Sequence, residues 1–194
     1  MNYYYLVASL PSLQLSAEPP MTIEEFRARA HEQLTASDLR ELNALLLGSG
    51  SSASEGSSAF GRAFVRREAA LLHAVALRRA ERRARDAESL RAAGVDVDMS
   101  MQAGVNDAFA AADPLERERR IDAMRWRWLE EQQERDPFAP TAVFSYALRL
   151  LLLHRWSERT EEKGLQDLSA QKARMLAGFD NLEFTMDAAT ETGA

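Results

Sequence analysis

The sequence predicts an all-α protein, folded as an irregular helical bundle with a long charged helical hairpin. Alanine, the strongest helix former, is its most frequent residue, and arginine, leucine and glutamate also favour helices. The 194 residues include only 9 glycines and 6 prolines, whereas a β protein of this length needs many turn residues. Apolar residues recur at helical spacing in several segments. These three observations favour helices throughout.

Composition divides the chain into four parts. We expect an N-terminal helical segment at residues 1–47 and a Gly/Ser-rich linker at 48–58, because a run of glycine and serine behaves as a flexible coil. Residues 59–178 are expected to form the helical bundle with its long hairpin. Residues 179–194 carry carboxylates and no basic side chain, and we expect them to form a mobile acidic tail.

The N-terminal part begins with an unusually apolar run that contains Tyr3, Tyr4 and Tyr5. So much aromatic surface should be packed into the fold. After two prolines, Thr22 and Glu25 have the spacing of a capping box and predict the start of a helix. A second short helix should follow from about residue 37 to a glycine C-cap at residue 48.

Residues 58–93 predict one long helix, about 50 Å at 1.5 Å per residue. Its first half has a normal apolar stripe, but the same line continues through Arg78, Arg82 and Arg85. Such a face either projects into solvent or pairs with an acidic helix. Residues 95–112 are ambiguous and should form a loop with a short helix around 108–112.

Asp113 and Pro114 are a strong N-cap and first helical position, and they predict a helix that continues to about residue 135. This helix is rich in carboxylates, so we expect it to form an antiparallel hairpin with the arginine-rich helix. Trp128 shares a face with Ile121 and Met124 and should be core. Trp126 lies on the opposite face, where it either packs on a second layer or contacts a partner.

The helix that begins at Thr141 is apolar in almost every direction, which is typical of a central helix in a bundle. Its apolar run at 142–153 is much shorter than the roughly 20 residues that span a bilayer. A last helix is expected at about 165–177. With no basic region before the apolar start, a signal peptide is not expected. We therefore expect a cytoplasmic protein, either free or peripheral at the inner face of the plasma membrane.

The sequence shows no catalytic or cofactor-binding pattern. There is no cysteine, and His31, His73 and His154 lack partners at metal-ligand spacing. The glycine-serine run has no lysine and does not resemble a phosphate-binding loop. We expect no enzyme activity, no metal or cofactor and no small-molecule substrate. The formal charge of −6 also makes nucleic acid an unlikely partner.

Four residues are candidates for a partner interface: Arg78, Arg82, Arg85 and Trp126. Tryptophan and arginine are enriched at binding hot spots. Each candidate also has an internal interpretation. The arginines could form ion pairs along the hairpin or a solvated surface, and Trp126 could pack between layers.

Three segments resemble a bacterial family of unassigned function encoded in operons for V/A-type rotary ATPases. They are residues 2–11 (Asn-Tyr-Tyr-Tyr-Leu-Val-Ala-Ser-Leu-Pro), 22–26 (Thr-Ile-Glu-Glu-Phe) and 146–156, which starts Tyr-Ala-Leu-Arg-Leu. Length and position suggest an analogue of the all-helical V-type ATPase component that forms a socket between the central rotor shaft and the membrane ring. That component consists of three similar helical units, whereas this chain has no internal repeat. The resemblance implies a helical, non-catalytic subunit or assembly factor.

As such a factor, the protein would link the rotor shaft and the membrane ring through protein–protein contacts. Its partners would be the central-stalk and membrane-ring subunits, so it would meet the membrane only indirectly. The alternative is a cytosolic helical adaptor unrelated to ATPases, which could bind RNA through its arginine-rich helix.

Overall fold

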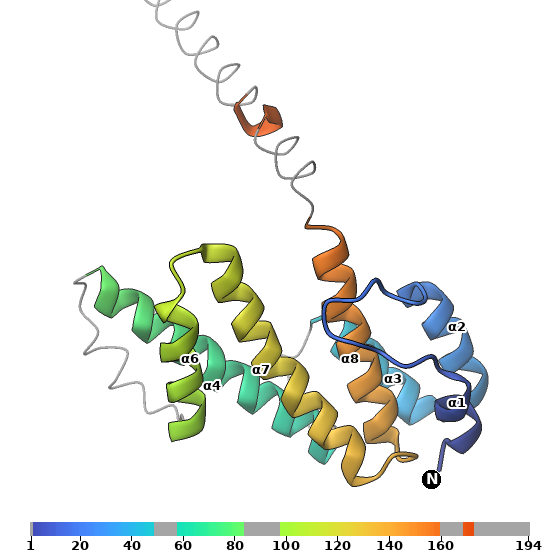
Figure 1. The fold of residues 1–194 in the computed structure, drawn as a ribbon. Coiled ribbons are helices and arrows are strands. Elements are labelled where there is room, and N and C mark those ends of the chain that lie inside the picture. Colours follow the sequence, from blue (N-terminus) through green and yellow to red (C-terminus); the bar gives the residue numbers. More distant parts are fainter. Residues whose placement is uncertain (1, 49–57, 84–97, 160–168, 173–194) are drawn as a thin grey trace, which may run out of the picture. The chain divides into compact units, whose positions relative to one another are not determined.

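The computed structural model describes residues 2–48, 58–83, 98–159 and 169–172, and these residues form helices and connections without any strand (Figure 1). The chain divides into two units, residues 1–154 and 155–194. The described helices are α1 (Tyr4–Ser9), α2 (Ile23–Gln33), α3 (Ala36–Leu46), α4 (Ala59–Arg82), α6 (Met99–Ala110), α7 (Pro114–Arg135) and α8 (Pro140–Ser157). The all-helical prediction is confirmed. Residues 49–57 of the linker predicted at 48–58 and the tail predicted at 179–194 lie outside the described residues.

The predicted starts of α2 and α7 are confirmed by their caps. The amide of Glu25 donates to Thr22 Oγ1 at 3.1 Å, and the amide of Thr22 donates to Glu25 Oε2 at 2.8 Å, which completes the capping box of α2. At α7, Asp113 accepts hydrogen bonds from the amides of Leu115 and Glu116. These side chains satisfy amides that have no partner inside their helix.

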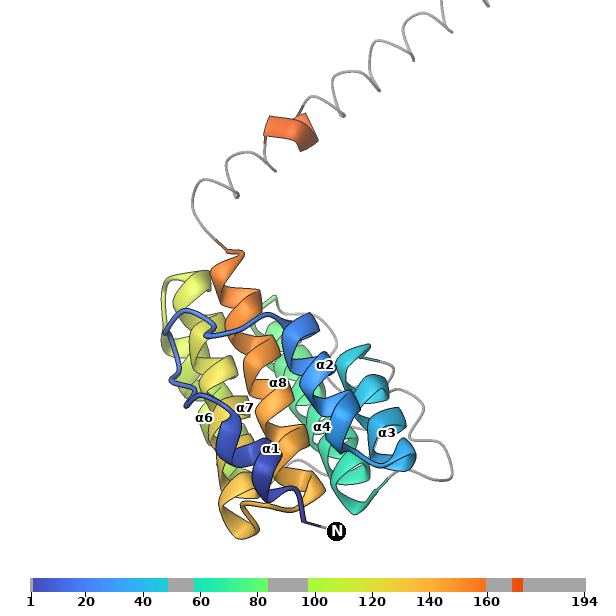
Figure 2. The ribbon, with the colours of Figure 1, turned by 90° about the vertical axis from the view of Figure 1, so that its right-hand side faces the viewer.

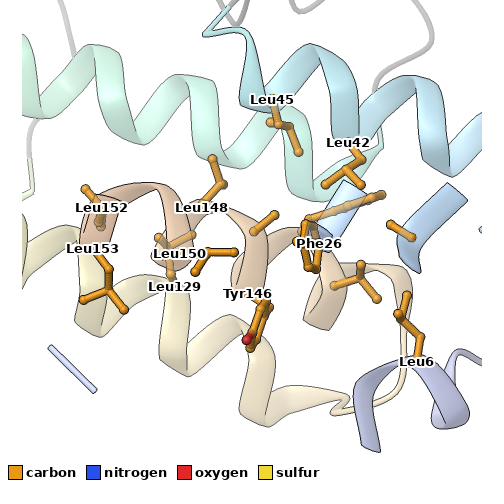
Figure 3. Close-up of a cluster of buried hydrophobic side chains, with 14 of the residues drawn as sticks. Leu6, Phe26, Leu42, Leu45, Leu129, Tyr146, Leu148, Leu150, Leu152 and Leu153 are labelled. Carbon is orange, nitrogen blue, oxygen red and sulfur yellow. The ribbon is translucent and has the colours of Figure 1, made fainter. Parts of the chain in front are cut away.

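The larger core is built around α8. The nine consecutive residues from Ala142 to Leu150 are at most 5% exposed, and because successive residues of a helix point about 100° apart, they are buried on every side of the axis. They are covered by α1, α2, α3, the beginning of α4 and the end of α7 (Figures 2 and 3). The prediction of a central apolar helix is confirmed.

A second core lies between α4, α6 and α7, around Leu71, Val105 and Ile121. At Gly104 in α6, an added Cβ would lie only 2.7 Å from the Cε of Met124. The missing side chain therefore leaves room for the end of the Met124 side chain from α7. The three helices of this core are seen together in Figure 1.

Residues 95–112 differ from the prediction. Instead of a loop with a helix at 108–112, α6 begins at Met99 and runs to Ala110. Asp98 caps it by accepting from the amide of Met101 at 2.6 Å. Met101, Val105 and Ala108 share its buried face, so packing against α4 and α7 stabilises a helix that composition alone leaves ambiguous.

The expected antiparallel pairing of the two charged helices is visible in their ion pairs. Glu68 in the first half of α4 contacts Arg125 in the middle of α7. Arg79 near the end of α4 contacts Glu118, which lies near the start of α7, so the two helices run in opposite directions. The described part of α4 ends at Arg82, and residues 84–93 of the predicted helix lie outside the described residues.

Replacing Phe26 with alanine tests the α8-centred core. Its ring is fully buried and stacks on Tyr146 at 5.5 Å between ring centroids. We expect Phe26→Ala to lower the free energy of unfolding by about 3–5 kcal/mol, because the removed ring leaves a cavity. Denaturant unfolding followed by circular dichroism measures this. The neighbouring exposed Arg27→Ala should change stability by less than about 0.5 kcal/mol, and an equal loss in both variants would contradict the assignment.

Candidate partner interface

Tyr3 anchors the N-terminus to the α8-centred core. Its side chain is only 4% exposed, and its hydroxyl forms a hydrogen bond with the carboxylate of Asp38 at the start of α3. Its amide donates to the carbonyl of Phe138, in the turn between α7 and α8, at 2.7 Å. The expectation that the tyrosine run packs into the fold is confirmed for this residue.

The next two tyrosines point outward. Tyr4 is 53% exposed and Tyr5 is 82% exposed. Consecutive residues of a helix point about 100° apart, so three adjacent tyrosines cannot all face one core. The expectation of full packing is therefore wrong for Tyr4 and Tyr5.

The exposed rings are held in place by their neighbours. Tyr4 lies 4.9 Å from Phe138 and 5.7 Å from Tyr5 between ring centroids. We call Tyr4, Tyr5 and Phe138 the tyrosine platform. Exposed aromatic side chains on a fixed backbone are typical of binding hot spots. The sequence signal for this platform was the tyrosine run itself, but its outward orientation depended on where α1 packs.

The arginine row on α4 is engaged within the fold where it is described. Arg78 pairs with Glu81 on its own helix at 2.9 Å. Arg82 donates to the carbonyl of Phe109 at 3.4 Å, and its guanidinium lies 5.9 Å from the centre of the Phe109 ring. Both contacts agree with the internal interpretation. Arg85 lies outside the described residues.

Trp126 is buried, at 6% exposure, in the α8-centred core. The guanidinium of Arg149 lies over its indole, 5.1 Å from the ring centre, in a cation–π contact. The structure therefore agrees with internal packing of Trp126. This residue is not one of the exposed candidates for a partner interface.

Trp128 packs differently from the prediction. It does not join Ile121 and Met124 in the second core but lies against Phe60 and Phe64, 5.8 and 6.1 Å away between ring centroids. The reason is that α7 passes both cores, so residues on one of its faces can pack in different places. Arg67 covers the indole at 5.4 Å.

Arg149 introduces a charge into the apolar helix α8. It is 5% exposed, donates to Glu130 Oε1 at 3.2 Å and forms a hydrogen bond with Gln133. Burial lowers the pKa of Arg149, and the nearby Glu130 carboxylate opposes this. Because the partners come from α7, the charge fixes the register of α7 against α8.

A second buried charge network joins α4 to α7. Arg125 binds Glu68 at 3.0 Å and Asp122 at 2.8 Å, and the side chain of Asp122 is 1% exposed. Burial acts to lower the pKa of Arg125, but the two carboxylates outweigh it and the pKa is raised. The cation is therefore held firmly in its charged form.

The described residues contain no cluster of three histidine, cysteine, aspartate or glutamate side chains that could hold a metal ion. Nε2 of His154 lies 2.8 Å from the carbonyl of Met21, a contact within the core. None of the described helices has the length and hydrophobicity to cross a membrane.

The Arg125 network gives a prediction about stability. We expect Arg125→Met to lower the free energy of unfolding by about 3–5 kcal/mol, because it leaves the Asp122 carboxylate buried without this counterion. Denaturant unfolding measures the loss. Adding Asp122→Asn should recover part of it, since the amide is neutral. The exposed Arg127→Met serves as the control, and a similar loss there would contradict the network's role.

Tyr146 gives a prediction about pH. Its hydroxyl donates to the carbonyl of Pro11 at 3.0 Å, and burial raises the pKa of its phenol from 10.0 to about 12. Below pH 10 the phenol is neutral in both folded and unfolded chains, so its contribution to the free energy of unfolding is fully present. Between pH 10 and 12 only the unfolded chain ionises, and this contribution to the free energy of unfolding falls as pH rises.

Ultraviolet titration of the folded protein should therefore show one phenolate, absent from Tyr146→Phe, that forms near pH 12. The stability of Tyr146→Phe should fall less than that of the wild type across the same interval. A phenolate forming near pH 10 at this position would contradict the burial argument.

Comparison with known proteins identifies one domain. Residues 99–170, which include α6, α7 and α8, match a family described as a protein of unknown function (DUF2764). No curated protein and no solved structure is significantly similar to the chain.

Proposed function

We propose that the protein is a non-catalytic subunit or assembly factor of a bacterial V/A-type rotary ATPase. In this role it links the rotor shaft and the membrane ring through protein–protein contacts. The observation that carries the proposal is that the three segments resembling the ATPase-operon family meet at one place in the fold, around Tyr146.

The contacts around Tyr146 are specific. Its hydroxyl binds the carbonyl of Pro11, from the first segment, and its ring stacks on Phe26, from the second. His154, in the third segment, contacts the carbonyl of Met21 just before the second. The three resembling segments therefore contribute to one packed centre, and this shared location supports interpreting them together.

Two tyrosines of the first resembling segment are not used by this centre. Tyr4 and Tyr5 belong to the first segment but lie in solvent. Packing in the core accounts for a tyrosine at position 3 but not for tyrosines at positions 4 and 5. Contact with another protein would remove the apolar surface of their rings from water. We therefore assign the tyrosine platform as a contact surface for another component of the ATPase.

The family match covers only part of the chain and only the last of the three resembling segments. The DUF2764 domain at 99–170 contains the third of the resembling segments, while the first two lie before it. An adaptor unrelated to ATPases is the alternative. Its RNA-binding form gains little support from Arg78 and Arg82, whose guanidinium groups contact groups within the fold.

Affinity capture from native membranes tests the proposal. The full-length tagged chain, cross-linked in its own host, should recover rotor-shaft and ring subunits. Tyr5→Ala should lower this recovery by about tenfold, in the range of a hot-spot residue, while Tyr5→Phe should retain most of it. Since Tyr5 is 82% exposed, both variants should fold normally. Recovery of neither class of subunit would overturn the proposal.

A further inference from the structure

The outer face of α4 carries a stripe of side chains that the cores do not use. The stripe consists of Arg62, Arg66, Ala69, Leu72, Ala76, Arg79 and Arg83. It lies opposite the face that buries Phe60, Leu71 and Val75. All its members are exposed except Ala76, which is half-buried, and Leu72 is 58% exposed. We call this set the α4 stripe.

The spacing of the α4 stripe is that of a helix–helix seam. Successive members are three or four residues apart, with a mean of 3.5. This is the repeat that keeps one face of a helix against a second helix along its length. Small and apolar residues occupy the middle, where two helices would approach most closely, and arginines occupy both ends.

The charge of the α4 stripe has one sign. The only carboxylates within α4 are Glu68 and Glu81, which pair with Arg125 and Arg78. At the edge of the stripe, Arg79 contacts Glu118 of α7 at 3.4 Å with both side chains substantially exposed. Such a surface pair contributes about 0–1 kcal/mol, so a partner carboxylate can replace it.

We propose that the α4 stripe binds an acidic amphipathic helix of a partner protein. Such a helix would place apolar residues over Ala69, Leu72 and Ala76 and carboxylates at its two ends. Those carboxylates would pair with arginines of the stripe, in charge-assisted hydrogen bonds. This inference goes beyond the proposed function, because it holds for any partner that presents such a helix.

A nucleic acid fits this surface less well. The stripe offers arginines to phosphate groups only at its two ends, because Arg66 and Arg79 are about 20 Å apart at 1.5 Å per residue. The exposed Leu72 between them offers nothing to a phosphate backbone.

Two designed helical peptides test the inference on the full-length protein. One carries leucine and alanine along the middle of its seam with glutamates at both ends; the other replaces every glutamate with lysine. Fluorescence anisotropy at low salt should show binding of the glutamate peptide only. Arg66→Glu/Arg83→Glu should raise its Kd by about tenfold or more and give measurable binding of the lysine peptide.

The control variant Arg27→Glu/Arg127→Glu makes the same change in net charge at exposed positions on α2 and α7. Its Kd for the glutamate peptide should stay within about threefold of the wild-type value, because charges far from the α4 stripe are screened by salt. Leu72→Ser should also weaken binding. Circular dichroism confirms that each variant is folded.

The inference is overturned if the glutamate peptide does not bind, or if the α4-stripe and control variants weaken it equally. It is also overturned if Leu72→Ser binds like the wild type, or if double-stranded RNA binds through the arginines where the peptide does not. These outcomes are independent of membrane capture through Tyr5, so either proposal can fail while the other stands.

Discussion

The burial of α8 is the constraint on which the larger core depends. This helix is apolar in almost every direction, and its residues from Ala142 to Leu150 are all buried. No single neighbour can cover a helix on all sides, so α1, α2, α3, α4 and α7 each contribute to its surroundings. At roughly 25 cal/mol per Å² of apolar surface removed from water, this burial is the main favourable term for these elements. The N-terminal segment therefore belongs to the same core as α8.

The buried charges have a different role from the apolar side chains. Apolar packing tolerates small shifts between helices, whereas a buried ion pair requires its partners at defined positions. Arg149 fixes α8 against Glu130 and Gln133, and Arg125 fixes α7 against Glu68. Both arginine networks involve α7, the helix that contributes to both cores. We infer that this helix sets the register of the helices packed on it.

The proposed function follows from how side chains are divided between these cores and the surface. The segments that resemble the ATPase-operon family are used mostly to build the α8-centred core, so their resemblance is structural. The exposed side chains that the cores do not use include the rings of Tyr4 and Tyr5 and the outer face of α4. Both are suited to contacts with other proteins, which is how a coupling or assembly factor works.

Local sequence was sufficient to specify the helices with strong signals: the capping box at Thr22, the Asp113–Pro114 start of α7 and the apolar residues on almost every side of α8. These signals act between residues a few positions apart, so they can be read without the fold. Tertiary contacts instead set the α6 helix at residues 99–110, the orientation of Tyr4 and Tyr5, and the burial of Trp126 beneath Arg149. Each depends on which helix lies alongside, because a periodic pattern gives the face of a helix but not its neighbour.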